Sequence, residues 1–237
     1  MKDREVKQKT QVFNVIILDR SGSMESIRRA AVDGFNETLA GIKKAQEKFA
    51  DTQDHFVSLV TFCGCETTNV FDKVPVASAH PLTMDSYVPC CLTPLYDAMG
   101  FTLTAMRKHV KDMEDAVVVV TIITDGMENA SCEYNGNAIS KFVKRLRGEG
   151  WTFTYMGANQ NSVEVAMSMS IRNARNFDYS NEGTLNSMRK DTNTRMNLFS
   201  RLDESKKKEC RSAVSMSKEK RYSLYATMAD DAFDEEL

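Results

Sequence analysis

Residues 13–24 read Phe-Asn-Val-Ile-Ile-Leu-Asp-Arg-Ser-Gly-Ser-Met. The first half of this stretch is a run of apolar, mostly branched side chains, which is typical of a buried β-strand. The run ends at the carboxylate of Asp19, and the hydroxyls of Ser21 and Ser23 follow at alternate positions. Gly22 lets the loop fold tightly, so that both serines can turn inward. One carboxylate and two hydroxyls at a strand end predict a site for a hard cation such as Mg²⁺, which takes oxygen ligands.

Two later stretches carry further oxygen-bearing side chains. Residues 116–124 form a second apolar run, and Asp125 follows it directly. Residues 92–98 place Thr93 before a proline and an amphipathic segment, which predicts a helix with Thr93 at its N-cap. Ligands of open α/β sheets bind beyond the carboxyl ends of the strands. Asp19 and Asp125 are predicted to lie at two such ends.

Together these three stretches resemble the von Willebrand factor type A (vWA) domain. Its metal-ion-dependent adhesion site (MIDAS) has the form D-x-S-x-S, then T, then D. The resemblance covers roughly residues 12–180 and is greatest to small stand-alone bacterial or phage vWA proteins. It implies five metal ligands: Asp19, Ser21, Ser23, Thr93 and Asp125. It also implies that the hydroxyls coordinate directly and that the aspartates exchange between direct and water-mediated roles. The expected ion is Mg²⁺, with Mn²⁺ or Ca²⁺ as alternatives.

The alternation of apolar runs and amphipathic segments predicts an α/β fold. The predicted strands are residues 13–18, 56–62, 67–74, 116–124, 151–156 and 176–179. The predicted helices are residues 25–49, 94–110, 137–147, 163–169 and 184–202. This order favours a doubly wound, mostly parallel sheet with helices on both faces and one antiparallel edge strand, residues 67–74.

The expected organisation is one domain with an extension, which suits a length of 237 residues. The divisions are a lead-in at 1–11, the vWA-like domain at 12–180, a helical extension at 181–202 and a charged tail at 203–237. The composition of the tail is typical of a disordered, solvated segment. A second hypothesis is that its acidic cluster at 230–236 occupies the metal site of its own or a neighbouring molecule.

Composition and charge argue against several classes of protein. The net charge of −2 argues against a globally basic nucleic-acid binder. No run approaches the roughly 18 apolar residues of a transmembrane helix, and the charged N-terminus lacks the apolar core of a signal peptide. These features predict a cytoplasmic protein with no membrane or nucleic-acid partner, whose six cysteines stay reduced.

Five of the cysteines are expected toward the same end of the fold as the metal ligands: Cys63, Cys65, Cys90, Cys91 and Cys132. A thiolate zinc site is one interpretation, and small thiols without a metal are the other. The spacing matches no recognisable zinc module, and adjacent cysteines seldom both bind one ion. In addition, Cys91 stands where vWA relatives often carry glycine.

Three further polar residues are candidates near the ligands. Asp97 lies one helical turn beyond Thr93 and is expected to orient the ligand loop as a hydrogen-bond acceptor. Glu128 and Asn129 are candidates for the rim of the site, with solvated surface positions as the alternative.

The resemblance implies a binding module rather than an enzyme. Two carboxylates roughly neutralise a divalent cation, so a carboxylate of a partner protein becomes an attractive further ligand. Cytosolic relatives often work with AAA-type ATPases, which makes such an ATPase a candidate partner. One alternative is a metal-dependent phosphohydrolase, although Ser21 stands where a second aspartate is expected. The other is a scaffold in an RNA–protein complex, against which the net charge argues.

Overall fold

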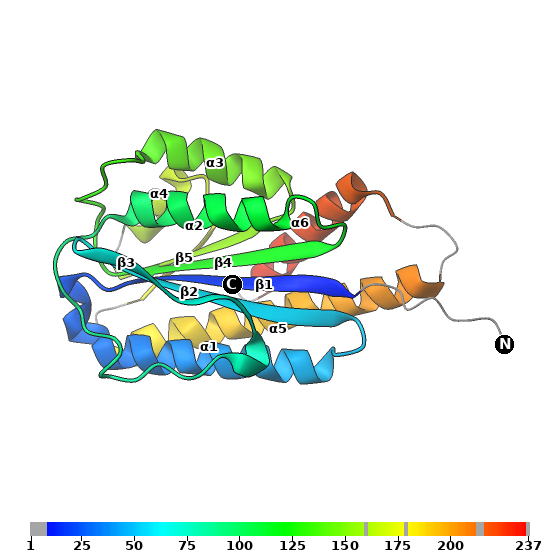
Figure 1. The fold of residues 1–237 in the computed structure, drawn as a ribbon, viewed down its shortest axis with the longest axis horizontal. Helices are drawn as coiled ribbons and strands as arrows, with labels where there is room; N and C mark the ends of the chain where they lie inside the picture. The colour runs from blue at the N-terminus through cyan, green and yellow to red at the C-terminus, as the bar shows by residue number, and fades with distance from the viewer. Residues whose placement is uncertain (1–8, 159–160, 178–179, 212–215, 236–237) are drawn as a thin grey trace.

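The computed structural model describes residues 9–158, 161–177, 180–211 and 216–235. They form a six-stranded sheet in the order β3-β2-β1-β4-β5-β6, with helices on both faces (Figure 1). The strands are β1 (Thr10–Asp19), β2 (Gln53–Cys63), β3 (Glu66–Pro75), β4 (Ala116–Thr124), β5 (Thr152–Gly157) and β6 (Asn173–Asn176). The α-helices are α1 (Arg28–Lys48), α2 (Leu95–Val110), α3 (Gly136–Gly148), α4 (Ser162–Ser168), α5 (Asn181–Arg211) and α6 (Lys218–Asp234). Two short 3₁₀ helices are η1 (Gly22–Ile27) and η2 (Val76–Ser78).

All neighbouring strands pair in parallel except β2 and β3, which are antiparallel. This arrangement confirms the predicted fold class, a doubly wound and mostly parallel sheet with one antiparallel edge strand. Among the described residues, no helix has the length and apolar character needed to span a membrane.

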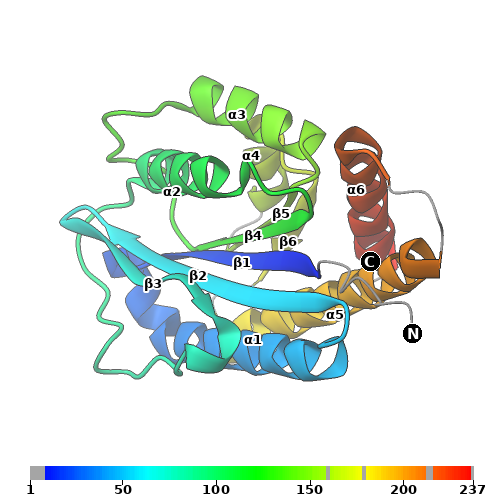
Figure 2. The same ribbon diagram turned by 45° about the vertical axis from the view of Figure 1, so that its right-hand side comes forward.

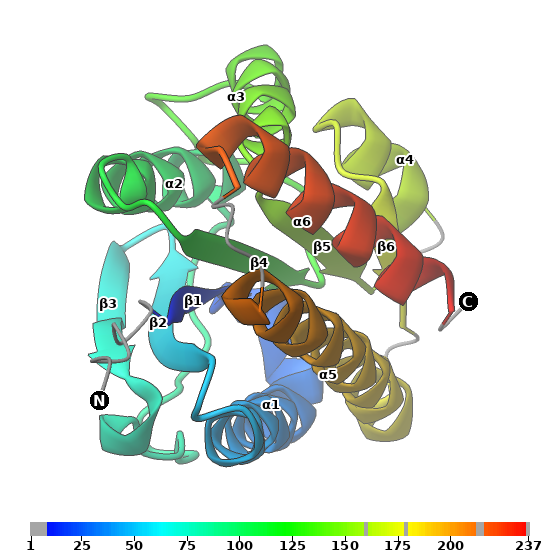
Figure 3. The ribbon, with the colours of Figure 1, turned by 90° about the vertical axis from the view of Figure 1, so that its right-hand side faces the viewer.

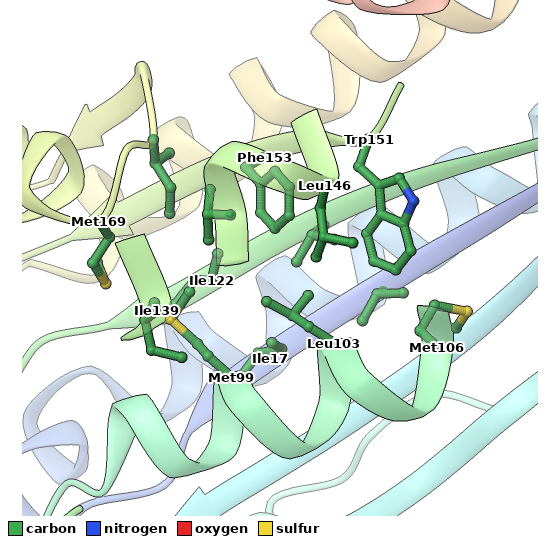
Figure 4. Packing of buried hydrophobic residues seen from close by; sticks show 14 of the residues in the cluster. Ile17, Met99, Leu103, Met106, Ile122, Ile139, Leu146, Trp151, Phe153 and Met169 are labelled. Atoms are coloured by element: carbon green, nitrogen blue, oxygen red, sulfur yellow. The ribbon is translucent and has the colours of Figure 1, made fainter. Parts of the chain in front are cut away.

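The central strand β1 is buried on both faces because it lies between β2 and β4 and is covered by helices. Its side chains alternate between the two faces. Phe13, Val15 and Ile17 pack in the cluster beneath α2 and α3, part of which Figure 4 shows. Ile16 and Leu18 pack instead with the apolar face of α1. This two-sided burial explains why the strand reads as a continuous apolar run.

The last strand lies earlier in the chain than predicted. β6 spans Asn173–Asn176, whereas the sequence analysis places the strand at 176–179, of which 178–179 are outside the described residues. Because β6 is polar, its sequence lacks the apolar pattern that predicts a strand. Arg175 is only 7% exposed, and it donates to Thr194 of α5 at 2.7 Å and stacks on Phe233 of α6. Helix packing therefore buries this strand without an apolar sequence.

The charged segment after residue 203 is helical, so the expectation of a disordered tail is wrong for the described residues. It forms the end of α5 and all of α6. Apolar side chains of α6 pack in one buried cluster with residues of β1, β4 and α5, and a buried charged group adds to this packing. Asp115, which is buried just before β4, forms ion pairs with Lys206 and Arg221. The Tyr225 hydroxyl also donates to this carboxylate, at 2.7 Å. These contacts tie the tail to the end of the sheet where the strands begin.

The acidic cluster of the tail lies far from the candidate metal ligands of its own chain. The two views in Figure 2 and Figure 3 place α6 beside the end of α5. Asp231 and Glu235 form ion pairs with Arg201 of α5. The hypothesis that this cluster fills the metal site of its own chain is therefore wrong as far as Glu235. Residues 236–237 lie outside the described residues.

A second buried network joins α5 to the middle of the sheet. Arg195 donates to Asp191 at 2.8 Å and to Asn14 of β1 at 3.0 Å, and it also donates to Thr121 of β4. All four residues are 3% exposed or less. A buried ion needs such full pairing, because removing one partner leaves an uncompensated charge. The network therefore fixes where α5 crosses the sheet.

We expect Arg195→Ala to lower the free energy of unfolding by about 3–5 kcal/mol, because it leaves Asp191 buried and unpaired. The matched control is Arg189→Ala on the same helix, which removes an ion pair with Glu37 whose side chains are 55% and 38% exposed. That change should cost at most about 1 kcal/mol. Urea denaturation measures both. Equal losses would contradict the role assigned to the buried network.

Candidate metal centre

The candidate metal centre lies at the end of the sheet where β1 and β4 finish. Asp19 is the last residue of β1. Leu18 pairs in parallel with Ile123 of β4, so the register sets Asp19 beside Thr124. Asp125 follows directly at the end of β4. The parallel register of two neighbouring strands thus brings together two carboxylates that are separated by more than a hundred residues of sequence.

The predicted hydroxyl ligands surround these carboxylates. Ser23 Oγ donates to Asp125 Oδ1 at 2.7 Å and lies 3.2 Å from Ser21 Oγ. Thr93 arrives from the loop before α2. A Cβ at Gly126 would lie 3.1 Å from Thr93 Oγ1 and 3.5 Å from Ser23 Oγ, so the glycine leaves room for both hydroxyls. The structure therefore brings all five predicted ligands to one place.

Burial sets the electrostatics of both aspartates. Asp19 is fully buried, and burial raises its pKa to about 6 from an ordinary value of 3.8. Two hydrogen bonds act against that rise, one from Thr124 Oγ1 to Asp19 Oδ2 and one from the Ser21 backbone N–H to Oδ1, both at 2.6 Å. Burial likewise raises the pKa of Asp125, against a hydrogen bond from Ser23. Without a cation, the ionised form of each carboxylate is therefore less favourable than it would be in water.

The donor set fits a hard divalent cation. Two carboxylates and three hydroxyls offer only oxygen ligands, as Mg²⁺, Mn²⁺ and Ca²⁺ prefer. A cation at this place would also supply the positive charge that two desolvated carboxylates need. Four of the ligands are buried, whereas Ser23 is exposed. The site is therefore open to solvent on the side of Ser23.

Two residues that support Asp19 were not identified from the sequence. Thr124 is the last residue of an apolar run, and its hydroxyl holds the Asp19 carboxylate. Tyr87 lies in the long loop before Thr93, is fully buried, and donates its hydroxyl to the backbone carbonyl of Asp19. Arg28 in turn donates to the Tyr87 carbonyl at 2.8 Å. The only signal for Tyr87 is that it is the one Phe, Tyr or Trp among residues 79–92.

The loop after β4 caps helix α2, and this corrects the predicted N-cap. The N-cap residue is Pro94, not Thr93. The Thr93 backbone N–H donates to Asn129 Oδ1 at 2.8 Å, and the Tyr96 N–H donates to Glu128 Oε2 at 2.9 Å. Donors at the start of the helix are thus satisfied by side chains from another loop. Glu128 and Asn129, predicted at the rim, use these oxygens to position Thr93 and the start of α2.

Asp97 orients a loop other than the predicted one. Its carboxylate accepts hydrogen bonds from the backbone N–H groups of Cys132, Glu133 and Tyr134, at 2.7–2.9 Å. Asp97 therefore fixes the loop that follows Asp125, rather than its own loop around Thr93. Asp97 is thus a hydrogen-bond acceptor, as predicted, but it acts on the loop after β4.

Four cysteines gather beside the centre, at the turn between β2 and β3 and in the loop before α2. Cys65 and Cys91 form a disulfide, which differs from the expectation that all cysteines are reduced. The sulfurs of Cys63 and Cys90 lie 3.3 Å apart as free thiols. Cys132, the fifth cysteine expected here, is free and exposed.

No protein-family model and no curated protein matches the sequence. Solved structures do match the fold. Proximal thread matrix protein 1 from the mussel byssus aligns with a TM-score of 0.50 and 14% identity over 78% of this chain and 46% of that one. Another structure of it, with a zinc-occupied MIDAS motif, gives the same TM-score. The pilus adhesin SpaC from Lactobacillus rhamnosus GG aligns with a TM-score of 0.59 and 13% identity, over 81% and 31% of the two chains.

The chain thus spans less than half the length of these proteins. At such low identity the likeness concerns the fold alone, and it establishes that this chain has a vWA-like α/β fold.

Proposed function

We propose that the chain is a divalent-metal-dependent protein-binding module that binds an acidic residue of a partner protein through Mg²⁺. The observation that carries the proposal is the convergence of two buried carboxylates and three hydroxyls from three separate loops. The residues that would hold the ion are Asp19, Ser21, Ser23, Thr93 and Asp125. Bound there, the ion would supply a Lewis-acidic position for an outside carboxylate.

The charge of the site supports an anionic partner group. Two carboxylates only neutralise a divalent ion, and the hydroxyls add no negative charge. The N-terminus of α2 lies next to Thr93 and adds positive potential. A carboxylate that approaches beside exposed Ser23 therefore meets an environment that favours negative charge.

The surface around the site supports a protein partner. Three large apolar side chains are exposed on the loops of the centre: Val88 at 48%, Leu92 at 56% and Met127 at 71%. Leu92 directly precedes Thr93, and Met127 follows Asp125 by two residues. Exposed apolar groups beside a charged centre suit an interface that anchors a partner around one acidic residue. The AAA-type ATPase named above is a candidate by analogy.

The alternative as a phosphohydrolase is less well supported. The Asp19 carboxylate is fully buried, and both of its oxygens accept short hydrogen bonds from within the protein. A nucleophilic aspartate needs an oxygen that the substrate can reach. The similar structures are of a matrix protein and an adhesin, which also favours a binding role over an enzymatic one.

Mg²⁺ should raise the melting temperature of the purified protein. At a metal concentration a hundredfold above Kd, the gain is about 3 kcal/mol, which corresponds to roughly 5–10 °C for a chain of this size. Asp19→Ala should abolish the shift, and Asp112→Ala, at an 88% exposed side chain, should retain it. Differential scanning fluorimetry with Mg²⁺ or EDTA measures this. An equal shift in wild type and Asp19→Ala would overturn the assignment.

The stabilisation of the fold by bound metal should become smaller as the pH falls. The folded-state pKa of Asp19 is about 6, above its ordinary 3.8, so the metal-free fold binds more protons than the unfolded chain between these values. Metal-free stability should therefore fall as pH rises through this window, by on the order of 3 kcal/mol. Metal must also displace this proton, so its affinity should fall below pH 6.

Melting curves at pH 5 and pH 7, with EDTA and with Mg²⁺, measure this effect. The metal-induced shift should be clearly larger at pH 7. Asp19→Asn, which cannot titrate, should remove this contribution from the EDTA curves. A metal-induced shift that grows on acidification would contradict the electrostatic account of the site.

Turnover of generic phosphate esters, nucleotides and peptides should be undetectable in Mg²⁺ or Mn²⁺. Chromogenic phosphatase and nucleotidase assays and peptide hydrolysis measured by mass spectrometry test this. Metal-dependent turnover that disappears in both Asp19→Asn and Asp125→Asn would replace the binding-module proposal with an enzymatic one.

A further inference from the structure

The four cysteines beside the metal centre form a compact sulfur cluster, defined as Cys63, Cys65, Cys90 and Cys91. Cys63 is the last residue of β2, and Cys65 lies in the turn between β2 and β3. The other two come from the loop that leads to Thr93. The sulfurs of Cys63, Cys65 and Cys90 lie within 4.8 Å of one another. Cys91 joins the same group through its bond to Cys65.

We propose that the sulfur cluster binds one Zn²⁺ ion when all four cysteines are reduced. Zinc favours four thiolates in a tetrahedron, with Zn–S bonds of about 2.3 Å and therefore about 3.8 Å between sulfurs. The 3.3 Å separation of Cys63 and Cys90 and the 4.8 Å limit over three sulfurs span that value. Small side-chain rotations would bring the four sulfurs around one ion.

Adjacent cysteines seldom share an ion, but the backbone here removes the difficulty. Cys91 has a φ of 62°, in the left-handed region that favours glycine. The chain therefore reverses between Cys90 and Cys91, and both sulfurs reach the opposite turn. One contacts Cys63 and the other Cys65. A non-glycine residue at this angle is strained, and binding of its sulfur to a metal would offset that strain.

The surroundings of Cys63 suit a negatively charged metal centre. Zn²⁺ with four thiolates carries a net charge of −2, which needs nearby donors. Arg20 Nη2 lies 3.5 Å from Cys63 Sγ, and the backbone N–H groups of Cys65 and Glu66 donate to the same sulfur. Cys63 is buried, whereas Cys65 and Cys91 are exposed, so an ion could enter from solvent.

Backbone hydrogen bonds join the sulfur cluster to the ligand loops. The Gly64 N–H donates to the Leu92 carbonyl at 2.8 Å, and the Cys90 N–H donates to the Arg20 carbonyl at 2.8 Å. The Gly22 N–H donates to the Cys91 carbonyl at 3.1 Å. Zinc bound by the sulfur cluster would therefore hold in place the loop that follows Asp19 and the loop that precedes Thr93.

The Cys65–Cys91 disulfide is the oxidised form of the same cluster. Its reduction by a phosphine consumes one water molecule. Phosphorus supplies the two electrons that break the S–S bond, and the water supplies two protons to the two thiols and its oxygen to the phosphine oxide. Zinc then takes the four sulfurs as thiolates, and four protons pass to solvent. Zinc binding and the disulfide therefore exclude each other.

The test uses the full chain, reduced with a phosphine and loaded with Zn²⁺ or Co²⁺. Elemental analysis counts the zinc, and the absorption spectrum of the Co²⁺ form shows whether sulfur is a ligand through its charge-transfer band. Cys63→Ser and Cys90→Ser should each lower the intensity of that band, because each removes one of the four thiolates, and the double variant Cys63→Ser/Cys90→Ser should lower it further. The double variant Cys132→Ser/Cys210→Ser, which changes free, exposed cysteines, should keep it. Circular dichroism checks that each variant is folded.

Asp19→Ala separates this inference from the proposed function, because it removes a ligand of the oxygen site only. The thiolate band should persist in Asp19→Ala. Cobalt bound without a thiolate band, or a band whose intensity neither Cys63→Ser nor Cys90→Ser lowers, would overturn the inference. So would a Cys65–Cys91 disulfide that survives the phosphine, as judged by mass spectrometry.

Discussion

The Asp19 carboxylate ends the central strand with no solvent contact, and this burial constrains everything around it. A charge in such a place needs donors on every side. Thr124 supplies one from the neighbouring strand, and the Ser21 backbone N–H supplies another from the loop. Tyr87 holds the backbone of Asp19 from the long loop that also delivers Thr93. Contacts with this one residue thus position the end of β4, the loop after β1 and the long loop before α2 relative to one another.

The sequence was sufficient to predict the central architecture and the residues that converge at the candidate site. Buried parallel strands are unmistakable in sequence because both faces need apolar side chains, as at 116–124. The five oxygen-bearing residues follow strand ends or precede a helix, so the topology of an α/β sheet places them together. In both cases a local pattern determines a non-local result, which is the condition under which sequence reasoning works.

The remaining features depend on contacts that leave no local pattern. The helical segments after residue 203 pack against β1 and β4 and pair with Asp115, which is almost a hundred residues away from Lys206. The last strand is polar because helices α5 and α6 supply partners for Arg175. The cap of α2 comes from Glu128, on another loop. Charge and polarity in a sequence normally indicate solvent, and they mislead wherever the partner is distant in the chain.

The two candidate centres would make opposite demands on the same loops. An oxygen site that exchanges ligands needs one open position, as the exposure of Ser23 provides. A closed thiolate site needs no exchange and can serve as a rigid support. Gly22, which lies between Ser21 and Ser23, donates its backbone N–H to the carbonyl of Cys91. A rigid sulfur-bound ion would therefore preorganise an oxygen site that must stay incomplete to bind its partner.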